Sequence, residues 1–431
     1  MSTATSCRFR WALLGLFALI CGPLIFSADG WNFDGDERAF YVTAIARIAP
    51  HWPAINLHTD TTSAVSPGYP YFLAGFTRVA GVHLWELRLI TWGLSAGLLA
   101  WLATRFSSGP AWLAAAAVLP LATSNFFVKS ASRVVTDNPA LLFMAIALTL
   151  IPGAGTARLH RAGLAAALAC WLRQIHGWLL LPLAAGAWLD APADPRSTVS
   201  ILSILFRRGP ALLTLLAVGA WLFLSWGGPV PPEWATVHTG GITLAPLACL
   251  LCVYGPLGLP YLLTLATPAE AVRLLRSGWV AGGAAVGLLL ALASPTTQDV
   301  AAGRWGGYFW RLVEATPAVA ERSLLITAGA VLGGALLGAM ALRLREAAPA
   351  RARIWALAFL GWALSTALNR LAFQRYFEPP ILIFLIWWLV LLLPSAPQTR
   401  FRWQPLAGLA AVQMVITLVT VHFTLLLRFR S

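Results

Sequence analysis

Blocks of apolar residues follow one another along almost the whole chain, with short polar segments between them. The longer blocks have about 17–25 residues, enough to cross the hydrocarbon core of a bilayer as an α-helix. None of them alternates apolar and polar residues in the manner of a membrane β-barrel strand. The pattern therefore predicts an all-α polytopic membrane protein with about 12–13 transmembrane helices.

The first predicted span covers residues 11–26, which we interpret as a span because no convincing signal-peptide cleavage site follows them. Arg8 and Arg10 precede it, so we expect its N-terminus inside. The further spans are predicted near 86–104, 111–124, 138–152, 162–175, 177–189, 209–226, 242–266, 277–294, 323–342, 353–371, 380–395 and 405–426.

Residues 27–84 form the longest interruption of this pattern, with several prolines and only short apolar stretches. They are expected to form a long first external loop with short helices lying along the membrane interface. We expect one integral membrane domain over 1–431, made of the first span at 1–26, the loop at 27–84 and a helical bundle at 85–431.

Composition and charge agree with a membrane protein, since 59% of the residues are hydrophobic and 11% are charged. The net charge of +14 comes from arginines scattered between apolar blocks. That distribution is typical of the positive-inside rule and indicates no nucleic-acid partner. The arginine clusters that the predicted order of spans places on the cytoplasmic side are 158/161, 196/207/208, 273/276, 343/345/351/353 and 400/402, whereas the tail arginines 428/430 fall outside.

The same order of spans places most of the remaining acids, histidines and aromatics on the external side. The densest acidic run is there, with Asp34, Asp36 and Glu37 directly after the first span. A half-dehydrated carboxylate that still faces water has the basicity needed of a general base. The alternative is that these acids cap a helix N-terminus. His51 and His58 of the same loop are interpreted as surface histidines rather than metal ligands.

Two further segments could bind substrate from the external side. Residues 61–71 are rich in turns and aromatics, so Tyr69 is expected in a groove for an elongated polar substrate, or else in an interfacial aromatic belt. Arg173 and Gln174 interrupt an apolar region at the ends of two predicted helices. An arginine at this depth needs a partner such as a lipid phosphate, unless it reaches the interface.

Three more polar motifs lie on the external side. Asp137 belongs to a Thr-Asp-Asn-Pro run that is typical of a helix N-cap. Arg304 lies beside Tyr-Phe-Trp-Arg, and Arg375 and Tyr376 belong to a second arginine-aromatic run. Guanidinium groups suit phosphate recognition and aromatic faces suit sugars or isoprenoid chains. Both runs could equally be ordinary interfacial anchors.

In this order the motifs resemble the GT-C membrane glycosyltransferases, and within them the dolichyl-phosphate-glucose alpha-1,2-glucosyltransferase family. The residues that carry the resemblance are Asp36-Glu37, Ser66-Pro-Gly-Tyr69, Leu87-Arg88-Leu89, Thr136-Asp137, Arg173-Gln174, Gly303-Arg304 with Tyr308-Phe-Trp-Arg311, and Arg375-Tyr376-Phe377 with Pro379 or Pro380. The family has a second proline before the glycine and an asparagine where Ile175-His176 stand, so the sugar and the acceptor stay open.

The resemblance implies a GT-C-type bundle and an inverting transfer from a polyprenyl-phosphate-linked sugar to a hydroxyl of a glycan, a lipid-linked oligosaccharide or a protein. Asp36 would be the base, with Glu37 and Asp34 beside it in the catalytic loop. Arg173, Arg304 and Arg375 would hold the leaving phosphate. Gln174, Tyr376, Tyr69 and Asp137 complete the expected substrate site. No cofactor is expected; a divalent metal would sit at Asp34 and Asp36. The expected location is a bacterial inner membrane, with the site on the periplasmic face and lipids around it.

Two other classes stay open. A lipid or polysaccharide transporter would also need arginines at membrane depth, but it should carry charges near the middle of spans and show two related halves. A non-catalytic subunit of an envelope assembly would leave the acids without a chemical role.

Overall fold

The computed structural model describes residues 3–27, 36–106, 111–153, 155–189, 198–238, 241–395 and 401–423. Almost all of its regular structure is helical. Within these residues, 7 helices are long and apolar enough to cross a membrane, or up to 9 if each of two bent helix pairs is one span. The chain is therefore an all-α polytopic membrane protein, as the hydrophobic pattern predicts.

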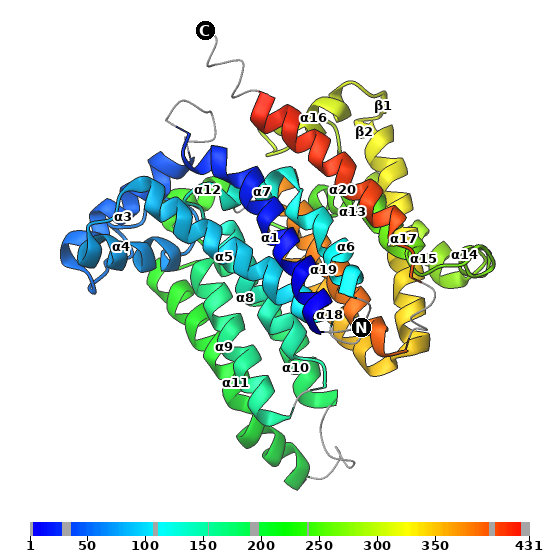
Figure 1. The fold of residues 1–431 in the computed structure, drawn as a ribbon, viewed down its shortest axis with the longest axis horizontal. Helices are drawn as coiled ribbons and strands as arrows, with labels where there is room; N and C mark the ends of the chain where they lie inside the picture. The colour runs from blue at the N-terminus through cyan, green and yellow to red at the C-terminus, as the bar shows by residue number, and fades with distance from the viewer. Residues whose placement is uncertain are drawn as a thin grey trace. The chain divides into compact units, whose positions relative to one another are not determined.

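The chain forms two compact units, each built from separate stretches of sequence (Figure 1). The loop unit, which contains the acidic loop, comprises Trp11–Leu102, Phe127–Thr236 and Thr420–Ser431. The C-terminal unit comprises Met1–Arg10, Ala103–Phe126 and Val237–Val419.

The loop unit holds, wholly or for the most part, α1 (Thr3–Ile25), η1 (Glu37–Val42), α3 (Thr43–Ile48), η2 (Ala49–His51), α4 (Gly68–Ala80), α5 (Leu84–Thr104), α7 (Asn125–Ala131), α8 (Asp137–Leu150), α9 (Thr156–Leu172), η3 (Gln174–Leu179), α10 (Leu180–Leu189), α11 (Thr198–Trp226) and η4 (Pro232–Trp234). Helices α8 and α11 both pack against α9 (Figure 1). The short elements η1, α3, η2 and α4 lie within residues 27–84, where one or two short helices are expected, and α5 begins where this loop ends. Their position along the membrane interface stays a prediction.

The C-terminal unit holds α6 (Ala111–Ala122), α13 (Ala245–Leu263), α14 (Pro268–Leu275), α15 (Gly278–Ala293), α16 (Gly307–Glu314), β1 (Ala318–Val319), β2 (Arg322–Ser323), α17 (Leu324–Ala347), α18 (Pro349–Ala367), η5 (Gln374–Tyr376), α19 (Glu378–Leu392), η6 (Leu393–Ser395) and α20 (Gln404–Thr417). Strands β1 and β2 form a two-stranded antiparallel sheet in which Ala318 pairs with Ser323. The helices α12 (Ala235–His238) and η8 (Leu418–Phe423) fall at the boundaries between the two units.

Every predicted span contains a helix, but several helices extend beyond the predicted ends. Helix α9 begins at Thr156 rather than at 162, and α11 begins at Thr198 rather than at 209. The early part of α9 carries Arg158 and Arg161, both exposed. Arginines do not end a helix, because the long side chain can carry its charge to the interface while the backbone stays helical.

Segments of the C-terminal unit that are predicted on the same side of the membrane contact one another. On the predicted cytoplasmic side, Arg273 pairs with Glu346 at 2.6 Å, and the Arg402 N–H donates to the Thr264 carbonyl at 3.0 Å. On the predicted external side, the Ala372 N–H donates to the Gly303 carbonyl at 3.1 Å. Loops on opposite faces of a ~30 Å hydrocarbon core could not touch in this way. The contacts agree with the predicted pairing of loops, while the identity of each face stays a prediction.

Glycines bring three helices of the C-terminal unit into close contact. A side-chain carbon on Gly333 of α17 would collide with the Leu251 carbonyl of α13. One on Gly283 of α15 would collide with the Gly334 carbonyl of α17. Transmembrane helices associate through such small residues because lipid supplies no hydrophobic driving force between them. These glycines thus fix the spacing of α13, α15 and α17.

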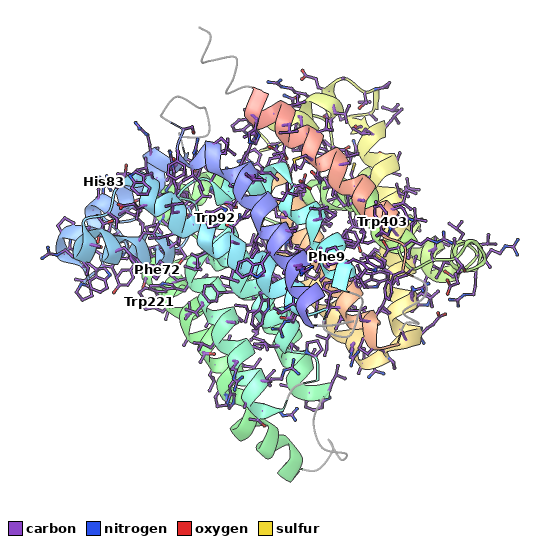
Figure 2. All side chains as sticks on the ribbon, in the orientation of Figure 1. Phe9, Phe72, His83, Trp92, Trp221 and Trp403 are labelled. Carbon is purple, nitrogen blue, oxygen red and sulfur yellow. The ribbon has the colours of Figure 1, made fainter. Side chains whose placement is uncertain are left out.

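Large apolar side chains project from both units (Figure 2). Phe72 of α4 is 45% exposed, and Trp403, just before α20, is 51% exposed. Exposed apolar surface on this scale is unusual for a water-soluble protein and fits contact with lipid.

Candidate functional site

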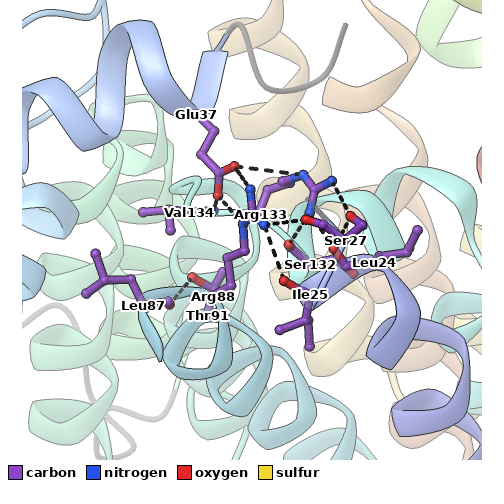
Figure 3. Close-up of polar contacts among 10 residues, drawn as sticks. All are labelled: Leu24, Ile25, Ser27, Glu37, Leu87, Arg88, Thr91, Ser132, Arg133 and Val134. Carbon is purple, nitrogen blue, oxygen red and sulfur yellow. Dashed lines mark hydrogen bonds and ion pairs between the residues drawn. The ribbon is translucent and has the colours of Figure 1, made fainter. Parts of the chain in front are cut away.

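Glu37 is the centre of a buried ion cluster in the loop unit (Figure 3). Its side chain is 0% exposed, and its two oxygens accept hydrogen bonds from Arg88 Nε at 3.0 Å and Nη2 at 2.6 Å. Arg133 Nε lies 3.8 Å from the same carboxylate, and the Val134 N–H donates to it at 2.7 Å. A bidentate guanidinium and a backbone donor compensate a buried carboxylate for the water it loses.

The two arginines of this cluster also hold the end of the first span. Arg88 donates to the carbonyls of Ile25 and Ser27, both at 3.2 Å. Arg133 donates to the Leu24 carbonyl at 2.6 Å. A helix C-terminus has carbonyls without partners in the helix, and these cations satisfy them. The cluster therefore joins α1, α5 and the turn before α8 to the start of the acidic loop.

Asp36 directly precedes Glu37 and is half-buried. It stands at the N-cap of η1, a single π-helical turn, but its carboxylate makes no capping hydrogen bond to that turn. Asp36 therefore occupies the position that the helix-capping alternative predicts, but its side chain does not make the capping hydrogen bond. Turns of this kind are frequent at functional sites. Asp34, the third acid of the run, lies outside the described residues.

Asp36 and Glu37 differ in how accessible their carboxylates are to a substrate. Glu37 has no exposed surface and is occupied by two guanidinium groups, so a substrate hydroxyl cannot reach it. Asp36 keeps partial exposure on the adjoining position. The hydrogen bonds of Glu37 fix the backbone at this point, and so they fix the position of the neighbouring Asp36.

The Thr136–Asp137 motif contacts the acidic-loop segment and the end of α9. The hydroxyls of Tyr41 and Thr136 lie 3.3 Å apart, and Asp137 forms an ion pair with Arg173. Thr136 is the N-cap of α8 and makes no side-chain capping bond, whereas Pro139 does stand in the first turn. The capping hydrogen bond that was predicted at this helix start is therefore wrong. The Asp137 carboxylate pairs with Arg173 instead, because a charged partner attracts it more strongly than the helix N–H groups do.

Arg173 and Gln174 follow α9 directly and connect it to the Ser66 turn. The Ser66 N–H donates to Gln174 Oε1 at 2.8 Å, and Gln174 Nε2 donates to the Ala64 carbonyl at 2.6 Å. Gly68, two residues after Ser66, has no room for a side chain, because a Cβ there would collide with the ring and the carbonyl of Trp171. The Ser-Pro-Gly motif thus owes its glycine to the close approach of Trp171.

Tyr69 is 0% exposed, and its hydroxyl is hydrogen-bonded to Thr91 of α5. It belongs to a buried cluster that also contains Leu73 and Ile45. In this conformation it lies in the core, where neither a groove nor an interfacial belt would place it. The contact it makes anchors the segment to α5.

His176 is a buried histidine beside the Arg173–Asp137 pair. Burial, together with the positive charge of Arg173, lowers the pKa of His176 to about 3 against the opposing effect of Asp137. Its ring is therefore neutral at physiological pH. The 6% exposed side chain leaves Nδ1 without a hydrogen-bond partner among the described residues.

Arg304 lies in the C-terminal unit, on the wall of a pocket of about 330 Å³. The residues that line this pocket are Thr243, Ala245, Pro246, Ala302, Arg304 and Arg370. Arg304 Nε donates to the Thr297 carbonyl at 2.7 Å, and Nη2 lies 3.4 Å from Asp299. A pocket with two guanidinium groups on its wall suits an anionic group.

Arg375 and Tyr376 belong to η5 of the same unit. The Arg375 guanidinium lies 5.5 Å from the centre of the Phe373 ring and 5.1 Å from that of Tyr376. Arg375 itself is exposed. Cation–π contacts of this kind hold the group at a surface where a phosphate or a sugar could reach it.

The structure thus divides the predicted site residues between the units. Asp36, Glu37, Tyr69, Asp137, Arg173 and Gln174 lie in the loop unit, whereas Arg304, Arg375 and Tyr376 lie in the C-terminal unit.

Sequence reasoning missed the partners of Glu37 and did not single out Glu378. Arg88 and Arg133 were visible as arginines close to apolar spans, where an uncompensated charge is costly. Glu378 was visible as an acid directly before Pro-Pro and a long apolar run. In both cases the signal was a charge at membrane depth, but only folding could name its partner.

Among the residues that the structure describes, no three or more His, Cys, Asp or Glu side chains form a group that could hold a metal ion. No family model, no curated protein and no solved structure matches the chain.

Proposed function

We propose that the protein is a GT-C-type membrane glycosyltransferase. It transfers a sugar, with inversion, from a polyprenyl-phosphate donor to the hydroxyl of a lipid-linked glycan, a polysaccharide or a protein. The proposal includes about 12–13 spans, a bacterial inner membrane and a site on the periplasmic face. Residues 27–84 are its catalytic loop.

One observation supports this proposal above the others: the motifs of the loop unit that resemble the GT-C enzymes contact one another although they are far apart in the sequence. Glu37 pairs with Arg88, which is 51 residues away. Gln174 bonds to Ser66 over 108 residues. The contacts Tyr41–Thr136, Asp137–Arg173 and Tyr69–Thr91 join the remaining motifs. Residues that merely anchored separate helices to the interface would not need these mutual contacts.

The expected chemistry needs a general base and preorganised cations. Asp36 would take the proton of the acceptor hydroxyl as that oxygen attacks the anomeric carbon. The bond from the anomeric carbon to the phosphate oxygen breaks, and the polyprenyl phosphate leaves with its electron pair. Preorganised cations stabilise the charge that develops on the phosphate, for which Arg173, Arg304 and Arg375 are the candidates.

The position of charges along the helices favours the enzyme over a transporter. Asp137 is the first residue of α8 and Glu378 the first of α19, while Arg88 lies in the second turn of α5. A transporter would place such groups near the middle of spans, where a substrate has to pass.

The test is Asp36→Asn in the purified protein, with transfer from synthetic polyprenyl-phosphate sugars followed by mass spectrometry of the products. The loss of a positioned general base should lower the rate at least about 100-fold. The matched control is Glu233→Gln, an exposed acid of η4 in the same unit, which should leave the rate unchanged.

Both variants should express and melt like the wild type, because Asp36 is half-buried and caps no helix. Full activity of Asp36→Asn would exclude Asp36 as the base. If the wild-type protein turns over none of the donors but carries a lipid-linked glycan across vesicles, it is a transporter instead.

A further inference from the structure

Glu378 is a buried carboxylate for which the proposed transfer has no use. Its side chain is 1% exposed at the start of α19, within the apolar segment Gln374–Leu392. Pro379 and Pro380 follow it, and both are buried. An ionisable group at membrane depth is costly to place, so it marks a functional position more often than chance would.

Neutral groups surround this carboxylate in the C-terminal unit. Ser124 Oγ donates to Oε1 at 2.6 Å, and Gln374 Nε2 donates to Oε2 at 2.7 Å. The Tyr308 hydroxyl lies 3.3 Å from Oε2 and accepts from Gln374 Nε2 at 2.7 Å. Gln413 of α20 also hydrogen-bonds to Glu378. The group thus joins four separate parts of the unit through hydroxyls and amides.

No positive charge balances it among the residues that the structure describes. No nitrogen of a described Arg, Lys or His side chain lies within 4.0 Å of the carboxylate. Two carbonyl oxygens of its own neighbours, Gln374 Oε1 and Gln413 Oε1, are buried without a donor. The described groups that donate to Glu378 are uncharged hydroxyls and amides, so a charged carboxylate would have hydrogen bonds there but no counter-ion. A buried charge without a counter-ion costs several kcal/mol, which a group avoids by becoming neutral.

The charged side chains on the elements that pack against α19 lie away from Glu378. Helices α17 and α18 carry Arg343, Arg345, Glu346, Arg351 and Arg353. Arg351 donates to the Leu391 carbonyl, at the opposite end of α19 from Glu378. On η5, Arg375 is directed to the rings of Phe373 and Tyr376.

The other packed elements bring weakly acidic thiols and phenols and, on α16, two exposed charged side chains. Helix α13 contributes Cys249, Cys252, Tyr254 and Tyr261, and α16 contributes Tyr308 and the exposed Arg311 and Glu314; α6, η6 and α20 have no titratable side chain. Burial raises the pKa of Tyr308, so its hydroxyl keeps its proton.

We propose that Glu378 is a proton-binding site whose carboxyl group is protonated in the resting protein. The proton comes from water and returns to water, with Ser124, Tyr308 and Gln374 as its hydrogen-bonding neighbours. The site does not depend on the proposed glycosyl transfer, because its residues are not assigned a role in that reaction.

The neighbours of Glu378 would transmit a change of its charge. Loss of the proton places a full negative charge against neutral donors, which strengthens the hydrogen bonds that Gln374 and Tyr308 donate to it. Gln374 belongs to η5 next to Arg375, and Tyr308 belongs to α16 close to Arg304. A proton at Glu378 therefore affects the two arginine-aromatic segments of the unit.

Infrared difference spectroscopy of the full-length protein tests the proposal, with Glu378→Gln as the variant and Glu233→Gln as the control. The wild type and the control should show the C=O stretch of a buried carboxylic acid at about pH 7, and Glu378→Gln should lose that band completely. The readout involves no sugar transfer, so its result stands even if Asp36→Asn keeps full activity.

Thermal unfolding in detergent provides the second measurement. A neutral Glu378 binds a proton that the unfolded chain has released, so the wild type should lose stability relative to Glu378→Gln as the pH rises from about 6 to about 9. A wild-type spectrum without the band at about pH 7 would overturn the proposal. So would a melting temperature that rises with added Na⁺ or K⁺ in the wild type and not in Glu378→Gln, since a cation would then balance the charge instead.

Discussion

Glu37 in the loop unit and Glu378 in the C-terminal unit are both carboxylates with almost no exposed surface, and each stands at the first residue of a helical element. Their surroundings differ in charge. Arg88 and Arg133 face Glu37, whereas hydroxyls and amides face Glu378. The same side chain is therefore stabilised in one place as an ion and, by our proposal, in the other as a neutral acid.

The comparison shows what a buried carboxylate can be used for. An ion held by two guanidiniums is fixed in place, because moving it would leave buried charges unpaired. A carboxyl group among neutral donors can gain or lose a proton without breaking an ion pair. The first arrangement is suited to positioning the acidic loop and the second to responding to protons.

The largest expected effect is that of Glu37→Gln, which keeps the shape of the side chain and removes its charge. Two buried guanidiniums would lose their counter-ion, so the variant should lose about 3–5 kcal/mol of stability. Thermal unfolding in detergent, followed by circular dichroism, measures it. Glu378→Gln is the matched control at about pH 7 and should change stability by less than about 1 kcal/mol.

The double variant Glu37→Gln with Arg88→Gln sharpens this test. Removing both charges should recover part of the loss, because one unpaired guanidinium is removed with the carboxylate. Equal losses in Glu37→Gln and Glu378→Gln would mean that both carboxylates are ionised, and the distinction between the two regions would fail.

A smaller effect is expected from Tyr308→Phe. The change removes one donor to Glu378 and leaves the aromatic ring, which stacks on Phe126 at 5.8 Å. The loss of one hydrogen bond should cost about 1 kcal/mol. Because the donor favours the ionised carboxylate, its removal should also shift the infrared titration of Glu378 to higher pH. A shift to lower pH would show that Tyr308 accepts a proton from Glu378 rather than donating to it.

The smallest effect concerns Asp60, a carboxylate of the first loop that is paired with one titratable partner. Burial by itself would raise the pKa of Asp60, but hydrogen bonds from the Asn56 N–H at 2.7 Å and from His51 at 2.9 Å hold that pKa below its usual range. A lowered pKa means that the stabilisation is complete above the ordinary value of about 3.9 and is lost as the pH falls through the folded-state value.

Asp60→Asn should accordingly lower stability by up to about 1 kcal/mol at neutral pH. Melting temperatures measured between neutral and acidic pH should converge with those of the wild type below about pH 4. A difference that persists at acidic pH would mean that packing of the side chain, and not its charge, provides the stability. Among these carboxylates, removal of the charge should therefore cost the least stability at Asp60 and the most at Glu37.

The sequence predicted the helices well and their ends less well. Each predicted span contains a helix, because backbone that is buried in lipid has to be helical, while the number of spans stays a prediction. Helices α9 and α11 begin before the predicted spans, at Thr156 and Thr198, but the apolar part of α11, Arg208–Trp226, agrees with the span predicted at 209–226. For the candidate site, the sequence identified Asp36-Glu37, Asp137 and Arg173 as unusual charges at helix ends.

Pairing could not be derived from the sequence. The packing of α5, α8 and α9 determines which residues become partners. It pairs Glu37 with Arg88, Asp137 with Arg173, and Ser66 with Gln174. The same holds for Tyr69, which the aromatic pattern placed at a surface and the packing placed in the core.

Composition and periodicity by themselves determined that this is a helical membrane protein, with its acids and its arginines gathered at the ends of spans. They act locally, through the cost of exposing backbone and charge to lipid. Only the tertiary structure decided which charges are neutralised, since that depends on residues up to 254 positions apart, as for Ser124 and Glu378. The difference between a fixed ion pair and a proton-binding carboxyl lies in those neighbours and not in the residue itself.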